Sequence, residues 1–180
     1  MSAVLCRYYA TKGAFKVLHY EIYETDIGKI LIAEDGKAIT NLCIEDSFDP
    51  TGAKRGETAL LKEALAALQA YLAGNQDAFA KLPLNPKGTV FQKRVWQALL
   101  EIPYGQTISY GQLARAIDNP KAVRAVGAAN GKNPIFVIIP CHRVIGADGS
   151  LTGFAYGLGL KRKLLDIETG ALQLDNSKQQ

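Results

Sequence analysis

The sequence is poor in the residues that build disulfide frameworks and metal centres. Its 180 residues include only three cysteines and two histidines. Because the cysteine count is odd and the cysteines have no paired spacing, we expect no disulfide framework. A structural zinc site needs four ligands, and Cys6, His19 and Cys43 supply only three scattered candidates. We therefore expect no metal ion and no other cofactor.

Long apolar runs and a strong charge of one sign are also missing. No apolar stretch approaches the roughly 20 residues that span a bilayer. Residues 1–15 lack the continuous apolar region and the small-residue cleavage site of a secretory signal. We therefore expect a cytoplasmic protein without a membrane partner. The net charge is only +4, so any surface for a nucleic acid must be local.

The first half of the chain predicts a small antiparallel sheet followed by a helix. Short β-prone runs are separated by glycine-containing turns, as in hairpins. An apolar stripe from Thr58 to Leu72 indicates a helix, and the stretch 82–88, with two prolines, is typical of a linker. The β-prone runs are residues 17–23, 29–33 and 38–44.

The second half predicts several short helices. Thr89 is the expected N-cap of a helix that runs to Ile102, and Ser109 is the expected N-cap of the next. Asn119 would cap a third helix with Pro120 at its first position. Two short helices joined by a tight turn form a helix-turn-helix. The predicted boundaries are 1–84 for an N-terminal α+β domain, 89–172 for a mostly helical C-terminal domain and 173–180 for a disordered tail.

The second helix of this motif would present a basic face of small side chains. A helix pressed against DNA benefits from small residues, because bulky side chains would hold its backbone away from the groove. An ordinary solvated helix with two charges has the same pattern, which alone does not decide between the two. If Val123 and Val126 face the core, the outer face carries Lys121, Arg124, Ala125 and Ala128.

The clearest chemical signal is a cysteine at the end of an apolar run. Residues 135–139 predict a buried strand, and Cys141, His142 and Arg143 follow it. Nearby positive charge favours the thiolate, which is the nucleophilic form of cysteine. Glu168, on the last predicted helix, could orient His142 as the third group of a triad orients its base. The alternative is a buried structural cysteine beside a surface histidine–arginine pair.

Two other cysteine–histidine chemistries fit less well. Zinc nucleobase deaminases use H-x-E followed by P-C-x-x-C. Here Val144 stands at the second cysteine position, and neither His19 nor His142 begins an H-x-E. A cysteine protease normally has its histidine far from the cysteine in sequence. Only His19 is distant, and it lies in a separate β-like segment.

The residues around Cys141 resemble the active-site motif of the O6-alkylguanine-DNA alkyltransferases, also called methylated-DNA–protein-cysteine methyltransferases. The resemblance covers about 89–170, and its loop 149–157 is similar to the bacterial branch. Segment 17–84 is similar only in outline, to the family's variable N-terminal domain. The matching motifs are PCHRVI (140–145), FQKRVW (91–96), IPYG (102–105), SY (109–110), PKAVRAVG (120–127) and NP (133–134).

This resemblance implies a chemical role for each matching residue. Cys141 would accept the alkyl group, His142 would withdraw its proton through a water, and Glu168 would hold His142. Asn133 would brace the turn that presents the cysteine. Tyr110 would donate a hydrogen bond to the leaving guanine and crowd the backbone so that the nucleotide rotates. The product would be a thioether that the protein does not reverse.

The resemblance also implies a partner, double-stranded DNA that contains O6-alkylguanine, bound through its minor groove by a monomer. Arg124 would fill the stack that the flipped base leaves, beside Lys121, Ala125 and Ala128. Phe154 stands where the family often has tyrosine, Ala155 where many members have serine, and Tyr156 where some have glycine. The residues implied for the base pocket are Val144, Phe154, Ala155 and Tyr156.

The sequence thus predicts an α+β protein that repairs DNA by a single transfer to itself. The target atom lies inside the duplex, so the base must first leave the stack. O4-alkylthymine is a second substrate that the resemblance allows. The alternative function is a helix-turn-helix DNA-binding regulator or lesion sensor without chemistry. Cys141, His142 and Glu168 separate the two functions, because a regulator has no need of them.

Overall fold

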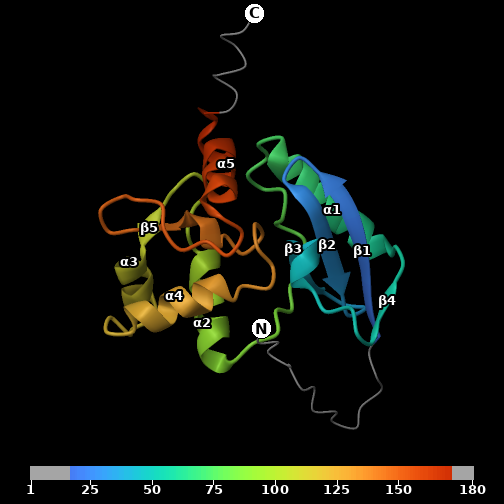
Figure 1. Ribbon diagram of the computed structural model, residues 1–180, viewed down its shortest axis with the longest axis horizontal. Coiled ribbons are helices and arrows are strands. Elements are labelled where there is room, and N and C mark those ends of the chain that lie inside the picture. The colour runs from blue at the N-terminus through green and yellow to red at the C-terminus, as the bar shows by residue number, and fades with distance from the viewer. Residues whose placement is uncertain (1–16, 172–180) are drawn as a thin grey trace, which may run out of the picture.

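The computed structural model describes residues 17–171, which form a sheet-and-helix half and a mainly helical half (Figure 1). The predicted α+β class, with the sheet in the N-terminal half, is confirmed. Cys6 and the predicted tail at 173–180 lie outside the described residues. The elements are β1 Leu18–Thr25, β2 Gly28–Glu34, β3 Ile39–Ile44, η1 Glu45–Ser47, β4 Ala53–Arg55, α1 Ala59–Leu72, α2 Val90–Leu100, β5 Ile108–Ser109, α3 Tyr110–Ala116, α4 Val123–Gly131, η2 Cys141–Arg143, β6 Val144–Ile145 and α5 Leu158–Thr169.

The N-terminal sheet has the spatial order β3-β2-β1-β4, and α1 packs on it (Figure 1). β1, β2 and β3 are antiparallel, as predicted. β4, which pairs parallel with β1, is absent from the prediction because its three residues carry no alternating apolar pattern. Thr58 caps α1 by accepting a hydrogen bond from the Leu61 amide. The side chains that α1 buries are Leu61, Ala64, Leu68 and Tyr71.

Helices α2 and α3 begin where their capping residues predict. Thr89 and Ser109 each form a capping box, in which the cap side chain and a glutamine three residues later bond each other's backbone amides. α2 ends at Leu100 rather than at Ile102. Within residues 17–171, no helix combines the length and the apolarity that crossing a bilayer requires.

The predicted start of α4 is wrong. The helix begins at Val123, and Asn119 and Pro120 belong to the preceding turn, in which the Ala122 amide bonds the Asn119 carbonyl at 2.9 Å. Proline is favoured at the second position of such a turn as well as at a helix start. Lys121 therefore precedes the helix, and Val123 is 38% exposed rather than in the core.

The predicted strand at 135–139 is also wrong, although all five residues are buried. The segment turns back on itself, with the Ile139 amide bonded to the Ile135 carbonyl at 3.0 Å and Val137 in the left-handed region at φ 71°. It is tied to β3, because Leu42 donates to the Pro134 carbonyl and accepts from the Phe136 amide. The apolar run predicted burial correctly, but a strand and a buried turn leave the same signature.

Candidate active site

Cys141 begins the short helix η2, at the end of the buried turn rather than of a strand. Its side chain is 4% exposed, and its amide donates to the Ile139 carbonyl at 2.8 Å. Asn133 spans the turn, donating from Nδ2 to the Ile139 carbonyl at 2.7 Å and accepting the Ile135 amide at 3.0 Å. Asn130, which sequence reasoning missed, donates to the Cys141 carbonyl at 3.3 Å. The backbone around the thiol is thus fixed on both sides.

His142 and Glu168 meet in the interior, where both side chains are fully buried. His142 Nε2 lies 2.7 Å from Glu168 Oε1, which favours the tautomer with its proton on Nε2. Nδ1 is buried and has no hydrogen-bond partner among residues 17–171. In that tautomer Nδ1 carries the free lone pair, and it is the ring nitrogen that can accept a proton.

The Glu168 carboxylate accepts hydrogen bonds from four groups. Besides His142, Oε1 accepts the Tyr71 hydroxyl at 2.7 Å, and Oε2 accepts the Gly105 amide at 3.1 Å. Arg143 donates to both oxygens, with Nε 2.9 Å from Oε2 and Nη2 2.9 Å from Oε1. Burial raises the pKa of Glu168, but the hydrogen bonds from His142 and Arg143 outweigh it and lower that pKa to about 2. Glu168 is therefore a fixed negative charge near neutral pH.

The thiol and the imidazole are both neutral at rest. Burial raises the pKa of Cys141 to about 11, against smaller opposing effects from Asn133 and Lys161. Burial likewise lowers the pKa of His142, although Glu168 raises it. The expectation that positive neighbours favour the thiolate is therefore reversed by desolvation, which penalises any charged form. A nucleophilic thiolate must form by transfer of its proton to a nearby base.

Lys161 is a fully buried cation that sequence reasoning missed. From α5, its ammonium group donates to the Val144 carbonyl at 2.5 Å and to the Thr152 carbonyl at 2.6 Å. A charge is buried only where such partners satisfy it. Its burial could have been predicted from sequence, because Lys161 shares one face of α5 with Leu164 and Glu168, and both of these face the core.

Tyr110 joins α3 to the loop that follows β6. Its hydroxyl donates to the carbonyls of Thr152 at 3.2 Å and Gly153 at 3.0 Å. Gly153 has φ 58°, and a Cβ atom there would lie 2.7 Å from the Tyr110 oxygen. Only glycine fits this approach, so the loop and Tyr110 are matched in shape.

The four predicted base-pocket residues differ in exposure. Val144 is buried, Phe154 and Tyr156 are half-buried and Ala155 is exposed. The Tyr156 ring lies 4.6 Å from the Phe136 ring and 5.8 Å from that of Phe154. Tyr156 therefore packs into an aromatic cluster with Phe136 of the buried turn 135–139, and does not extend into solvent.

The predicted DNA-facing residues lie on the exposed side of the helix-turn-helix. Arg124, Ala125 and Ala128 are exposed on α4, and Lys121 is exposed in the turn before it. Arg124 makes no hydrogen bond or ion pair with the described residues. α4 also approaches the site, because a Cβ atom on Gly127 would lie 3.7 Å from the Tyr110 ring.

The fold and the site define a class of protein. It combines a small N-terminal sheet, a helix-turn-helix and a buried cysteine next to a histidine that is bonded to a glutamate. A family model described as 6-O-methylguanine DNA methyltransferase, DNA binding domain, matches residues 90–170. A second, described as 6-O-methylguanine DNA methyltransferase, ribonuclease-like domain, matches residues 18–86. The chain belongs to this family, which confirms the resemblance seen in its motifs.

Individual relatives agree. The methylated-DNA–protein-cysteine methyltransferase of Haemophilus influenzae is 46% identical over 154 residues, which cover 84% of this chain and 86% of the relative. The methyltransferase of the same name from Mycobacterium tuberculosis is 44% identical over 161 residues, which cover 88% of this chain and 97% of the relative. The crystal structure of Mycobacterium tuberculosis OGT in complex with DNA has a TM-score of 0.79 at 45% identity, covering 84% of this chain and 93% of that one.

Proposed function

We propose that this protein repairs DNA by moving the alkyl group of O6-alkylguanine irreversibly onto Cys141. The observation that carries the proposal is that Cys141, His142 and Glu168 are all buried, with His142 bonded to Glu168, in a chain of this family. It acts, in this proposal, as a cytoplasmic monomer on double-stranded DNA. A regulator or lesion sensor without chemistry is disfavoured, because it would gain nothing from a buried Glu168–His142 pair.

The chemistry follows from the neutral resting site. His142 Nδ1 accepts the Cys141 proton through a water, and Glu168 stabilises the imidazolium that forms. The thiolate then attacks the alkyl carbon, so that the S–C bond forms while the C–O6 bond breaks. The guanine leaves as an anion with the electron pair of that bond, and accepts a hydrogen bond from Tyr110 in place of the Thr152 and Gly153 carbonyls. The proton held by His142 then returns through solvent and neutralises the guanine. A thioether has no leaving group for a simple reversal, so each chain reacts once.

The DNA would be bound by α4 through the minor groove. Exposed Ala125 and Ala128 would allow close approach of the helix, and exposed Lys121 would contact phosphate. Arg124, which has no protein partner among residues 17–171, is free to enter the stack as the base leaves. Unstacking a base costs a few kcal/mol, and an inserted guanidinium offsets part of that cost.

The test is to incubate the protein with a duplex that carries one O6-methylguanine and to weigh the intact protein. We expect a gain of one methyl group per chain, with no turnover, and a peptide map that locates it on Cys141. Unchanged mass with retained DNA binding would instead favour the regulator. Repeated turnover, or a methyl group on Cys6 or Cys43, would contradict the assignment of the acceptor.

Replacing Arg124 with alanine should slow repair of duplex DNA by about tenfold while leaving reaction with free O6-methylguanine nearly unchanged. The reason is that Arg124 assists flipping, and about 1.4 kcal/mol of lost assistance corresponds to that factor. Single-turnover rates on the two substrates provide the measurement. Arg55→Ala, which removes the same charge from an exposed position on β4, is the control. Equal losses on both substrates would show that Arg124 is structural.

Replacing Tyr156 with glycine should speed inactivation by free O6-benzylguanine by about a hundredfold. Displacing a reacting centre by ~1 Å can cost that much in rate, and in this proposal the Tyr156 ring borders the alkyl pocket and narrows it. Tyr156→Phe is the matched control, because it retains the ring that packs on Phe136 and should stay slow. Equally fast inactivation of the parent and the glycine variant would mean that Tyr156 does not border the alkyl pocket.

A further inference from the structure

Tyr71 brings the N-terminal half into the reactive site. It lies near the end of α1, 97 residues from Glu168 in sequence, and its side chain is 1% exposed. Its hydroxyl donates to Glu168 Oε1 at 2.7 Å and lies 3.3 Å from His142 Nε2. No motif of the C-terminal half includes it, so it reaches the His142–Glu168 pair from a separate part of the fold.

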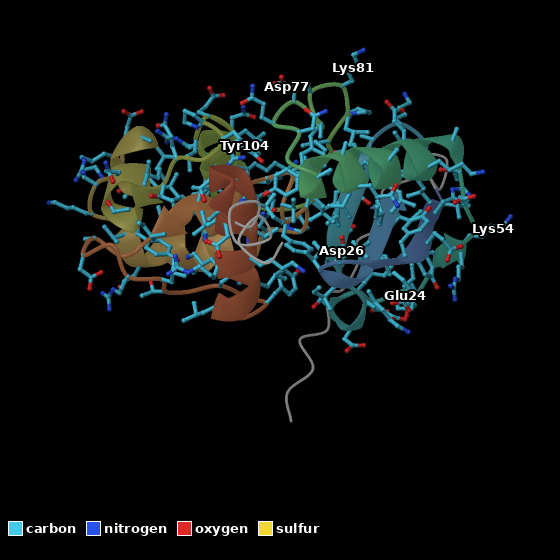
Figure 2. All side chains as sticks on the ribbon, turned by 90° about the horizontal axis from the view of Figure 1, so that it is seen from above. Glu24, Asp26, Lys54, Asp77, Lys81 and Tyr104 are labelled. Carbon is cyan, nitrogen blue, oxygen red and sulfur yellow. The ribbon has the colours of Figure 1, made fainter. Side chains whose placement is uncertain are left out.

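The ring of Tyr71 is held by other aromatic side chains. Its centroid lies 5.2 Å from that of Phe79 and 6.1 Å from that of Tyr104, the latter edge-on. Tyr104, labelled in Figure 2, also lies under the Arg143 guanidinium at 5.7 Å. Burial, with the nearby carboxylate, raises the pKa of Tyr71 well above its usual range. The hydroxyl therefore keeps its proton and donates a hydrogen bond to Glu168 Oε1, which is nearer than His142 Nε2.

We propose that Tyr71 is a positioning residue for alkyl transfer, through which the N-terminal half fixes the direction and strength of the Glu168–His142 hydrogen bond. This inference rests on the proposed function. Oε1 accepts from both Tyr71 and His142, so the hydroxyl takes up part of the carboxylate's charge. It also holds Oε1 in line with Nε2. Without the hydroxyl, Oε1 would attract the imidazole proton more strongly and would be less well placed.

The expected direction of a pH effect follows from the groups that face His142. Burial lowers the pKa of the imidazole, Glu168 on α5 raises it, and Arg143 on η2 and Lys161 on α5 lower it further. Cys141, the neighbour of His142 on η2, is neutral, and Tyr71 on α1 weakens the effect of Glu168. Removing the Tyr71 hydroxyl should therefore raise the pKa of His142. Since a protonated imidazole cannot accept the Cys141 proton, transfer should then fail at a higher pH.

Tyr71→Phe tests the proposal, with Tyr23→Phe as its matched control. Tyr23 also bonds a glutamate, Glu57, but at 3.5 Å and at the surface. Single-turnover methyl transfer from O6-methylguanine duplex is measured across pH. Tyr71→Phe should be about tenfold slower near neutral pH, as expected for a lost hydrogen bond to a charged group, and its acid midpoint should move to higher pH. Tyr23→Phe should change neither.

Titration of the imidazole signals by NMR gives a second readout that does not depend on transfer. The chain has only two histidines, so His142 can be assigned by comparison with a His19→Gln variant. The Tyr71→Phe protein should show a raised His142 pKa. A rate that falls equally at every pH, an unchanged rate, or an unchanged His142 pKa would overturn the inference. If the parent protein itself transfers no methyl group, it is the proposed function that fails.

Discussion

Replacing Cys141 with alanine should abolish methyl transfer and leave binding to DNA essentially unchanged. The thiol is the only proposed acceptor, and no other group in the turn has a nucleophilic sulfur. Alanine fits the buried position without a new polar group, and Asn130 and Asn133 still hold the backbone of the turn through two carbonyls and the Ile135 amide. The turn should therefore keep its shape. Intact-protein mass after incubation with damaged duplex, together with a gel-shift titration, measures the two effects.

Cys43→Ala is the matched control for this loss. Cys43 is also buried, on β3, where burial raises its pKa to about 12. Cys43 lies on β3 and not on η2 beside the His142–Glu168 pair, so its removal should leave transfer at the parental rate. Residual methylation of the Cys141→Ala protein would mean that a second residue accepts the group. Loss of DNA binding by that variant would mean that the cysteine side chain supports the fold.

Replacing Glu168 with glutamine should destabilise the protein by about 3–5 kcal/mol and remove almost all transfer. The mostly buried Arg143 side chain, which is 11% exposed, would lose its counter-charge, which is the costly way to break a buried pair. His142 would lose the carboxylate that stabilises its protonated form. Unfolding by denaturant at neutral pH gives the stability change, and a single-turnover assay gives the chemical one.

Asp118→Asn is the control for that stability change. It breaks the exposed Arg94–Asp118 pair, which has a similar 3.1 Å separation but should contribute less than about 1 kcal/mol.

Glu168 also predicts a pH effect, because its pKa falls from 4.5 in a free chain to about 2 in the fold. Its stabilisation is complete above pH 4.5 and is lost as the pH falls toward 2. The glutamine variant should lack that part of the acid sensitivity. Equal destabilisation by Glu168→Gln and Asp118→Asn would mean that the buried Glu168 carboxylate stabilises the fold no more than an exposed ion pair does.

The sequence predicts best where a single side chain decides the local backbone. Thr89 and Ser109 carry the hydroxyl and the following glutamine of a capping box, and α2 and α3 start there. Asn119 and Pro120 are less decisive, because the same pair suits a helix start and a turn. The left-handed conformation of Val137 has no local signal at all, because β-branched residues avoid it.

Some residues of the reactive site could likewise be predicted from the sequence, and others could not. Cys141, His142 and Glu168 could be found from a short motif and one helix face, and Lys161 shares that face with Glu168. Tyr71 could not be found, because its only visible signal is an apolar stripe on α1. Its hydroxyl acquires a partner only through packing between the two halves. What the sequence misses is therefore mostly contact between residues far apart in the chain.

The contacts between the two halves lead us to expect that the reactive site forms late as the chain folds. Tyr71 meets Glu168 across 97 residues, and the acceptor turn bonds to β3 through Leu42. Such distant contacts close late, because the entropy of closing a long loop opposes them until neighbouring contacts are in place. Cys141 also leaves the ribosome before Glu168. We therefore expect a half-folded chain to hold Cys141 without the oriented His142–Glu168 pair, so that base-assisted transfer requires the finished fold.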